Sequence, residues 1–120
     1  MEELKRQQEE ALKVANEYCD KLIPGIEKVI IELTGEKFFD TDEYLKHIMD
    51  GINWIIGVFN GTKDLINADS KVIEKEEINR SVLALNAAVN NNNDKEIASN
   101  LREILVFVKK MKAVAKKIDA

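Results

Sequence analysis

The stretch LKVANEYCDKLIPGIEKVIIEL, residues 12–33, decides the fold class because its apolar side chains recur at alternating steps of three and four. That spacing places them along one face of an α-helix, as in a heptad seam. Ile23 and Ile30 widen the stripe beyond a two-stranded seam, which predicts a helix that faces several neighbours in a bundle. The seam residues are Leu12, Ala15, Cys19, Leu22, Ile26, Val29 and Leu33.

Pro24 and Gly25 interrupt this pattern, because a proline inside a helix lacks a backbone donor and costs about 3 kcal/mol. The apolar phase nevertheless continues on both sides of the interruption. We therefore expect one long helix with a kink at Pro24 rather than two helices. Thr34 and Gly35 are expected to end it, with Gly35 in the left-handed conformation.

A second helix is expected to begin at Asp40 or Thr41, either of which would cap it. Gly57 and Gly61 form a GxxxG spacing, which we interpret as a contact between packed helices. The pattern weakens after Gly61, so the structure of residues 61–75 stays open. The apolar face of this helix is Leu45, Ile48, Met49, Ile52, Ile55, Ile56 and Phe59.

Two more helices follow, the third from about Lys75 to Val89. Residues 90–93 are four consecutive asparagines, which favour a turn because Asn tolerates left-handed geometry. Asn93 and Glu96 have the spacing of a capping box at the start of the last helix. The seam of that helix is Ile97, Leu101, Ile104, Val108, Met111, Ala115 and Ile118. Four helices with short polar connectors predict an all-α, antiparallel four-helix bundle, with residues 1–120 forming one domain.

The composition agrees with a helical bundle, since 45% of the residues are hydrophobic and 33% are charged. Cys19 is the single cysteine, so no intramolecular disulfide forms and the core must hold the fold. The charged start at residues 1–6 lacks the apolar region of a secretory signal, and no apolar run reaches the roughly 20 residues of a membrane span. We expect a cytoplasmic protein.

The sequence disfavours catalysis and metal binding. His47 is the only histidine, and Glu43 and Asp50 share its helical surface. The pattern lacks the further ligands of a di-iron or zinc site, so a solvated helix face explains these residues better than a metal role. Cys19 lies on the seam, which favours a buried thiol over a nucleophile. No glycine-rich phosphate loop is present. We expect a protein that is not an enzyme and needs no cofactor.

A candidate basic face lies near the end of the last helix, where Lys109, Lys112 and Lys116 share one side. Such a face would neutralise the phosphates of a nucleic acid. No recognised nucleic-acid-binding module accompanies it, and positive charge near a helix carboxyl end complements the helix dipole. Nucleic acid is therefore the disfavoured partner.

The aromatic residues Phe38, Phe39, Tyr44 and Trp54 are the candidate partner-binding group. Phe38 and Phe39 stand in a connector, and the other two lie on the second helix. Large apolar side chains in such a place either close the end of the bundle or anchor a partner. Both interpretations stay open, with closure of the bundle end the more frequent case.

One family resemblance emerges from about Ile26 to Ile118. It rests on the helix that ends near Thr34-Gly35, on the run IMDGINWII at residues 48–56, and on the Asn92-Asn93-Asp94 turn. This layout resembles the flagellar secretion chaperones, which are small helical bundles that clasp the carboxyl-terminal helices of flagellin and delay its polymerisation. The chain is equally similar to uncharacterised small helical-bundle families of low-GC bacteria, whose richness in Ile, Lys and Asn it shares.

These observations predict a non-enzymatic interaction module, an adaptor or an export-chaperone-like bundle. Its partner would be a helical segment of another protein or of a second copy, bound in an apolar groove. The alternative is a bundle that binds nucleic acid through its basic face.

Overall fold

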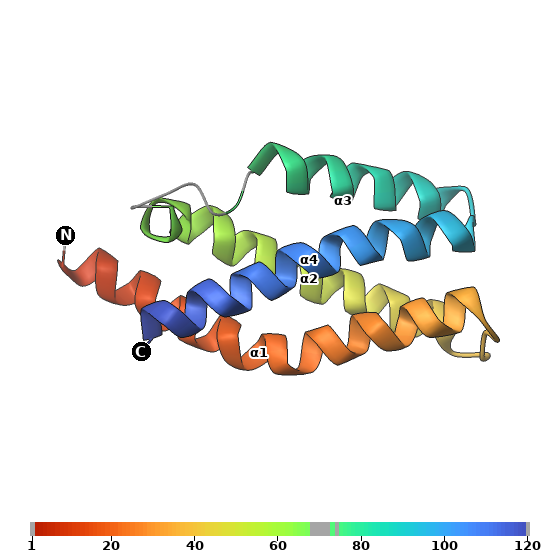
Figure 1. The fold of residues 1–120 in the computed structure, drawn as a ribbon, viewed down its shortest axis with the longest axis horizontal. Coiled ribbons are helices and arrows are strands. Elements are labelled where there is room, and N and C mark those ends of the chain that lie inside the picture. Colours follow the sequence, from red (N-terminus) through yellow and green to blue (C-terminus); the bar gives the residue numbers. More distant parts are fainter. Residues whose placement is uncertain (1, 68–72, 74, 120) are drawn as a thin grey trace.

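The computed structural model describes residues 2–67, 73 and 75–119, without the side chains of residues 118 and 119. Its four helices are α1 (Glu2–Thr34), α2 (Thr41–Ile66), α3 (Lys75–Asn90) and α4 (Asp94–Asp119). No strand occurs among the described residues. The chain is an all-α four-helix bundle, as the periodicity predicts (Figure 1).

α4 lies at the centre of the arrangement, because it packs against each of the other three helices. α1 packs against α4 and α2, whereas the backbone of α3 comes close to α4 alone within the described residues. Figure 1 shows consecutive helices running in alternating directions along the long axis. Contacts between α1 and α2 follow this order, since Gln8 meets Gly61 and Lys28 meets Tyr44.

The core consists of the predicted seams. All seven seam residues of α1 are buried, as are the six of α4 from Ile97 to Ala115, while the side chain of Ile118 lies outside the described residues. Pro24 is exposed inside the continuous helix α1, so the proline does not split that helix. The kink at Pro24 stays a prediction. Phe59 of α2 and Phe107 of α4 meet edge to face in the core, with ring centroids 5.7 Å apart.

The end of α1 at Thr34 is confirmed, but the predicted left-handed Gly35 is wrong, since no glycine has a positive φ. The last carbonyls of α1 find other donors. The Gly35 amide donates to the Ile31 oxygen at 2.9 Å, and the Thr34 hydroxyl donates to the Ile30 oxygen at 2.8 Å. With these carbonyls satisfied, the helix ends without a left-handed cap.

The asparagine turn between α3 and α4 has the predicted geometry. Asn92 has a φ of 53°, in the left-handed region that asparagine tolerates. The Asn93 side-chain oxygen accepts a hydrogen bond from the Glu96 amide at 3.2 Å, which caps the start of α4. At the start of α2, by contrast, Asp40 occupies the cap position without a side-chain hydrogen bond.

The interpretation of Gly57 and Gly61 as a helix-packing contact is wrong. A Cβ atom added at either glycine would meet no atom of the described residues within 4 Å. The close approach between α1 and α2 occurs instead at Gly25 and Gly51. A Cβ at Gly25 would lie 2.7 Å from the Ile48 Cδ1 atom, and one at Gly51 would collide with the Tyr18 hydroxyl.

These glycines give a first prediction. Gly57→Ala and Gly61→Ala are each expected to raise the free energy of unfolding by up to about 1 kcal/mol, because alanine favours the helix and space is free. Gly51→Ala has the same helical advantage but displaces Tyr18, so it is expected to lower stability by about 1 kcal/mol or more. Urea unfolding of the three variants measures the difference, and equal effects at Gly51 and Gly57 would contradict the packing described.

Candidate functional site

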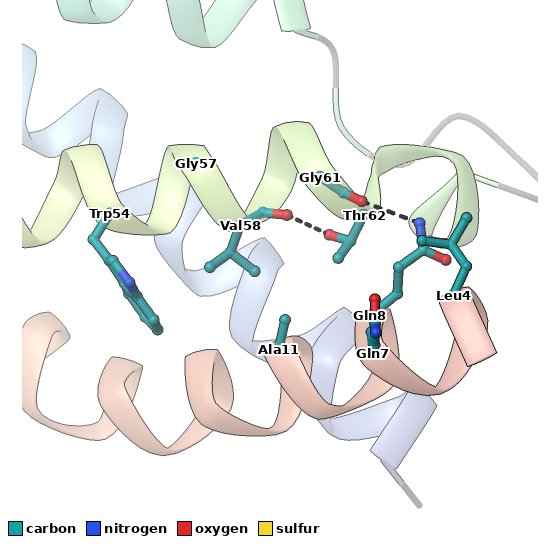
Figure 2. Close-up of a pocket in the computed structure, with 9 residues that line it drawn as sticks. All are labelled: Leu4, Gln7, Gln8, Ala11, Trp54, Gly57, Val58, Gly61 and Thr62. Carbon is teal, nitrogen blue, oxygen red and sulfur yellow. Dashed lines mark hydrogen bonds between the residues drawn. The ribbon is translucent and has the colours of Figure 1, made fainter.

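A groove runs between the first half of α1 and the second half of α2. Its main part is a shallow hollow of about 420 Å³, open to solvent, and is drawn in Figure 2. A second hollow of about 360 Å³ shares Trp54 with it, so that the two adjoin. The first is lined by Leu4, Gln7, Gln8, Ala11, Trp54, Gly57, Val58, Gly61 and Thr62. The second is lined by Val14, Tyr18, His47, Asp50, Gly51 and Trp54, and we call both together the α1–α2 groove.

Small residues keep the groove open. Gly57 and Gly61 have no side chains to fill it, and Ala11 stands on the opposite wall (Figure 2). Both glycines are solvent-exposed although they lie inside a helix. A glycine in a helix interior costs about 1 kcal/mol relative to alanine, and among the described residues no neighbour packs where their side chains would stand to compensate that cost.

Trp54 is the largest side chain of the groove. It is 43% exposed, and its indole points from α2 across to α1 (Figure 2). There it packs edge to face on Tyr18, with ring centroids 5.2 Å apart and an angle of 77° between the planes. Leu4 and Val14 add exposed apolar surface on the α1 side, at 59% and 50%. Half-exposed aromatic and aliphatic groups around a hollow are typical of a binding surface.

Two polar side chains of the groove, those of Gln8 and Thr62, are paired within the protein. The Gln8 Nε2 atom donates to the Gly61 carbonyl at 3.0 Å and thereby links α1 to α2 (Figure 2). The Thr62 hydroxyl donates to the Val58 carbonyl at 2.6 Å. With these groups satisfied, the groove floor offers mainly apolar contact to a ligand.

The connector between α1 and α2 presents two phenylalanines to solvent. Phe39 is fully exposed and Phe38 is 58% exposed, so they do not close the end of the bundle. The loop is nevertheless held in place, because the Phe38 amide donates to the Thr41 hydroxyl at 2.9 Å. That hydroxyl donates in turn to the buried Glu32 carboxylate at 2.7 Å.

Lys37 anchors the same connector from its other side. Its ammonium lies 3.0 Å from a carboxylate oxygen of Asp42 and 3.5 Å from one of Asp94. The hydrogen bond to Asp42 is the largest of several causes that raise the pKa of Lys37 above its ordinary value. Lys37 thus joins the loop to the first turns of both α2 and α4.

The four predicted aromatic residues do not form one patch. Tyr44 is half-buried, and the Lys28 ammonium lies over its ring at 4.8 Å from the centroid. Phe39 precedes α2, and Trp54 lies 13 residues after the first residue of that helix, about 20 Å along its axis at the helical rise. Sequence reasoning missed that Leu4, Gly57 and Gly61 line the hollow beside Trp54. For Gly57 and Gly61 the helical spacing from Trp54 was the available signal, whereas Leu4 belongs to α1 and is brought there by the packing of the two helices.

The groups considered for chemistry differ in burial, with His47 at the surface and Cys19 in the core. His47, Glu43 and Asp50 are exposed on α2, and no three or more His, Cys, Asp or Glu side chains in the described part of the chain cluster around a metal-sized position. Cys19 is fully buried, and burial raises the pKa of its thiol to about 11. A thiol in that state is a poor nucleophile.

The candidate basic face is partly neutralised. Lys112 forms an ion pair with Asp20 of α1, whereas Lys109 and Lys116 are exposed. An ammonium paired within the protein has less charge to offer a phosphate. Across residues 2–67 and 75–119, no helix is long and apolar enough to cross a membrane.

Residues 10–114 match a family described as a domain of unknown function, DUF8042, and the chain belongs to that family. The match covers all of α2 and α3 and most of α1 and α4. It does not support the resemblance to flagellar secretion chaperones. No curated protein and no solved structure matches the chain.

Proposed function

We propose that this protein is a non-enzymatic interaction module that holds a helical segment of another protein in the α1–α2 groove. The observation that carries the proposal is the open hollow of about 420 Å³ beside Trp54, with bare Gly57 and Gly61 in its wall. A chaperone-like role in export or assembly is one form that such binding takes. We propose it for this protein on architectural grounds alone.

The shape of the groove supports a helical ligand. Two roughly aligned helices form its walls, and a third helix laid between them is held by apolar residues at three and four residue spacing. Gly57 and Gly61 allow the backbone of the incoming helix to come close, as small residues do in tight helix pairs. Trp54 and Leu4 then supply the large apolar contacts.

Photo-crosslinking tests the proposal. A crosslinking amino acid is placed at Gln7, an exposed residue that lines the groove, and in a matched variant at Leu83, which is 69% exposed on α3. Each protein is irradiated in an extract of the source organism, and the crosslinked site on the partner is mapped by mass spectrometry. We expect a partner that is captured from position 7 and not from position 83, through a segment that is helical.

The mapped segment is then made as a peptide and its affinity is measured by calorimetry. Trp54→Ala is expected to weaken binding at least about tenfold, as for a central aromatic anchor, and Leu83→Ala to leave it unchanged. Circular dichroism confirms that both variants fold. Identical crosslinking from both positions, or a peptide insensitive to Trp54→Ala, would show that the groove is not the binding surface.

A further inference from the structure

The two walls of the α1–α2 groove each carry a stripe of acidic residues. On α1, Glu3, Gln7, Glu10, Val14 and Glu17 follow one another at steps of four and three, so they lie on one side of the helix. Gln7 and Val14 line the groove. The three glutamates of this stripe therefore stand along its α1 edge, and all three are exposed.

The α2 wall repeats this arrangement. Asp50, Trp54, Gly57, Gly61 and Asp64 again follow at steps of four and three, with the tryptophan and both glycines in the groove wall. Asp50 also lines the hollow next to Trp54, and both aspartates are exposed. Five carboxylates thus frame an apolar floor on its two long sides.

These carboxylates keep their charge available. None of the five forms an ion pair with another described residue, unlike Asp20 and Asp42, which pair with lysines. On α1, Arg6 and Lys13 are set one step further around the helix, away from the groove, while Lys21 follows Glu17 at a step of four at the end of the stripe. The side chains of Lys21, Lys46 and His47 lie at one end of the α1–α2 groove.

From this charge pattern we infer that the groove takes a basic amphipathic helix of another protein, with lysine or arginine flanking its apolar face. The inference rests on the function proposed above and adds the chemical class of the partner. Positive residues on both flanks of such a helix meet the acidic stripes while its apolar face covers Trp54 and Leu4.

A second copy of this chain fits the groove less well. In a symmetric dimer each groove faces the other, so the glutamates and aspartates of the two molecules would oppose one another. The chain carries a net charge of −4, which adds to that repulsion. A heterologous, positively charged helix avoids both costs.

Three model peptides of about 18 residues, or five helical turns, test the inference. They share the same leucine positions at helical spacing, and their polar positions are all lysine, all glutamine or all glutamate. None contains tryptophan, so the emission of Trp54, the only tryptophan of the chain, reports binding in the groove. The lysine peptide is expected to bind at least about tenfold more tightly than the glutamine peptide, and the glutamate peptide more weakly than either.

Charge reversal on the wall locates the effect. The double substitution Glu10→Lys with Glu17→Lys is expected to lower the affinity for the lysine peptide about tenfold and to raise the affinity for the glutamate peptide. The matched control is Glu27→Lys with Glu103→Lys, which changes net charge equally at exposed positions outside the groove. It is expected to alter affinity less than about threefold, the range of ordinary surface charges. Gly61→Leu, which fills the hollow, is expected to abolish the change in Trp54 emission.

Equal affinity for the lysine and glutamine peptides would overturn the inference, while groove-dependent binding of both would leave the proposed function standing. An equal loss of affinity for the lysine peptide in the control variant would show a general attraction of unlike charges, and this too would overturn the inference. Failure of the proposed function is recognised separately, by crosslinking that does not depend on the groove. If the affinity for the lysine peptide falls more steeply with rising salt than the affinity for the glutamine peptide, this would support the inferred attraction between the acidic stripes and a basic helix.

Discussion

Phe59→Ala is expected to lower the free energy of unfolding by about 3–5 kcal/mol, the usual cost of removing a fully buried phenylalanine. Phe59 is 1% exposed, and it meets Phe107 edge to face, so the change loses both apolar burial and an aromatic pair. The contact also joins α2 to α4. Because a domain of this kind is stable by only about 5–15 kcal/mol, the loss threatens the whole fold.

Phe39→Ala is the matched control, since it removes the same side chain from a fully exposed position. Its expected effect on stability is within about 0.5 kcal/mol. Urea denaturation followed by circular dichroism measures both variants. Comparable losses for Phe59 and Phe39 would contradict the placement of Phe59 in the core and of Phe39 in solvent.

The helices could be predicted because apolar periodicity follows directly from burial. The seam from Leu12 to Leu33 is buried at every predicted position, and α3 differs from its expected end by one residue. Chain segments that bury one face must repeat with the helical period, whichever neighbour covers that face. Such information is local and can be read without knowing the tertiary structure.

The length of α2 was harder to predict, because a glycine can stand either at the end of a helix or inside it. The weaker pattern after Gly61 left the end of the helix open, whereas the buried stripe continues from Phe59 through Thr62 and Ile66 at helical spacing. Thr62 is polar, and it fits the core because its hydroxyl bonds the Val58 carbonyl. A polar residue that is satisfied within its own helix is easily mistaken for the end of the apolar face.

The candidate site was only partly predictable for the same physical reason. An exposed aromatic such as Trp54 attracts attention by its chemistry, but a groove is made as much by missing side chains as by present ones. Whether a glycine marks a close contact or an empty wall depends on the neighbouring helix. Gly51 meets Tyr18, whereas Gly57, two turns away on the same helix, meets nothing.

The lysine side of α4 shows the limit of local charge patterns. Lys109, Lys112 and Lys116 share a face by helical spacing, yet Lys112 pairs with Asp20, which is distant in sequence and belongs to α1. The spacing gives the direction in which a side chain points, not the charge that it meets there. The tertiary pairing of α1 with α4 supplies that second fact.

Cys19 is expected to resist alkylation at least about a hundredfold more strongly in the folded protein than in denaturing urea, at about pH 8. Burial raises the pKa of its thiol from 9.0 to about 11, and each pKa unit lowers the thiolate fraction tenfold. The thiol is also fully covered by the packed helices. Iodoacetamide labelling followed by mass spectrometry measures the rate. A Cys19→Ala chain that also carries Leu83→Cys serves as the control, because position 83 is exposed and should label at an ordinary rate.

The same burial makes stability depend on pH in a definite direction. Below about pH 9 the thiol of Cys19 is protonated in both the folded and the unfolded chain, so titration of this group has no effect. Between about pH 9 and 11 the unfolded chain releases the proton while the folded chain retains it, which favours unfolding as pH rises. Cys19→Ala lacks this contribution, so its unfolding free energy should fall less between about pH 8 and 10.5 than that of the parent protein. Two outcomes would contradict the burial of this thiol: an unfolding free energy that falls equally with pH in both proteins, or iodoacetamide labelling of native Cys19 as fast as at position 83. Either would place the thiol at the surface and α1 out of its contact with α4.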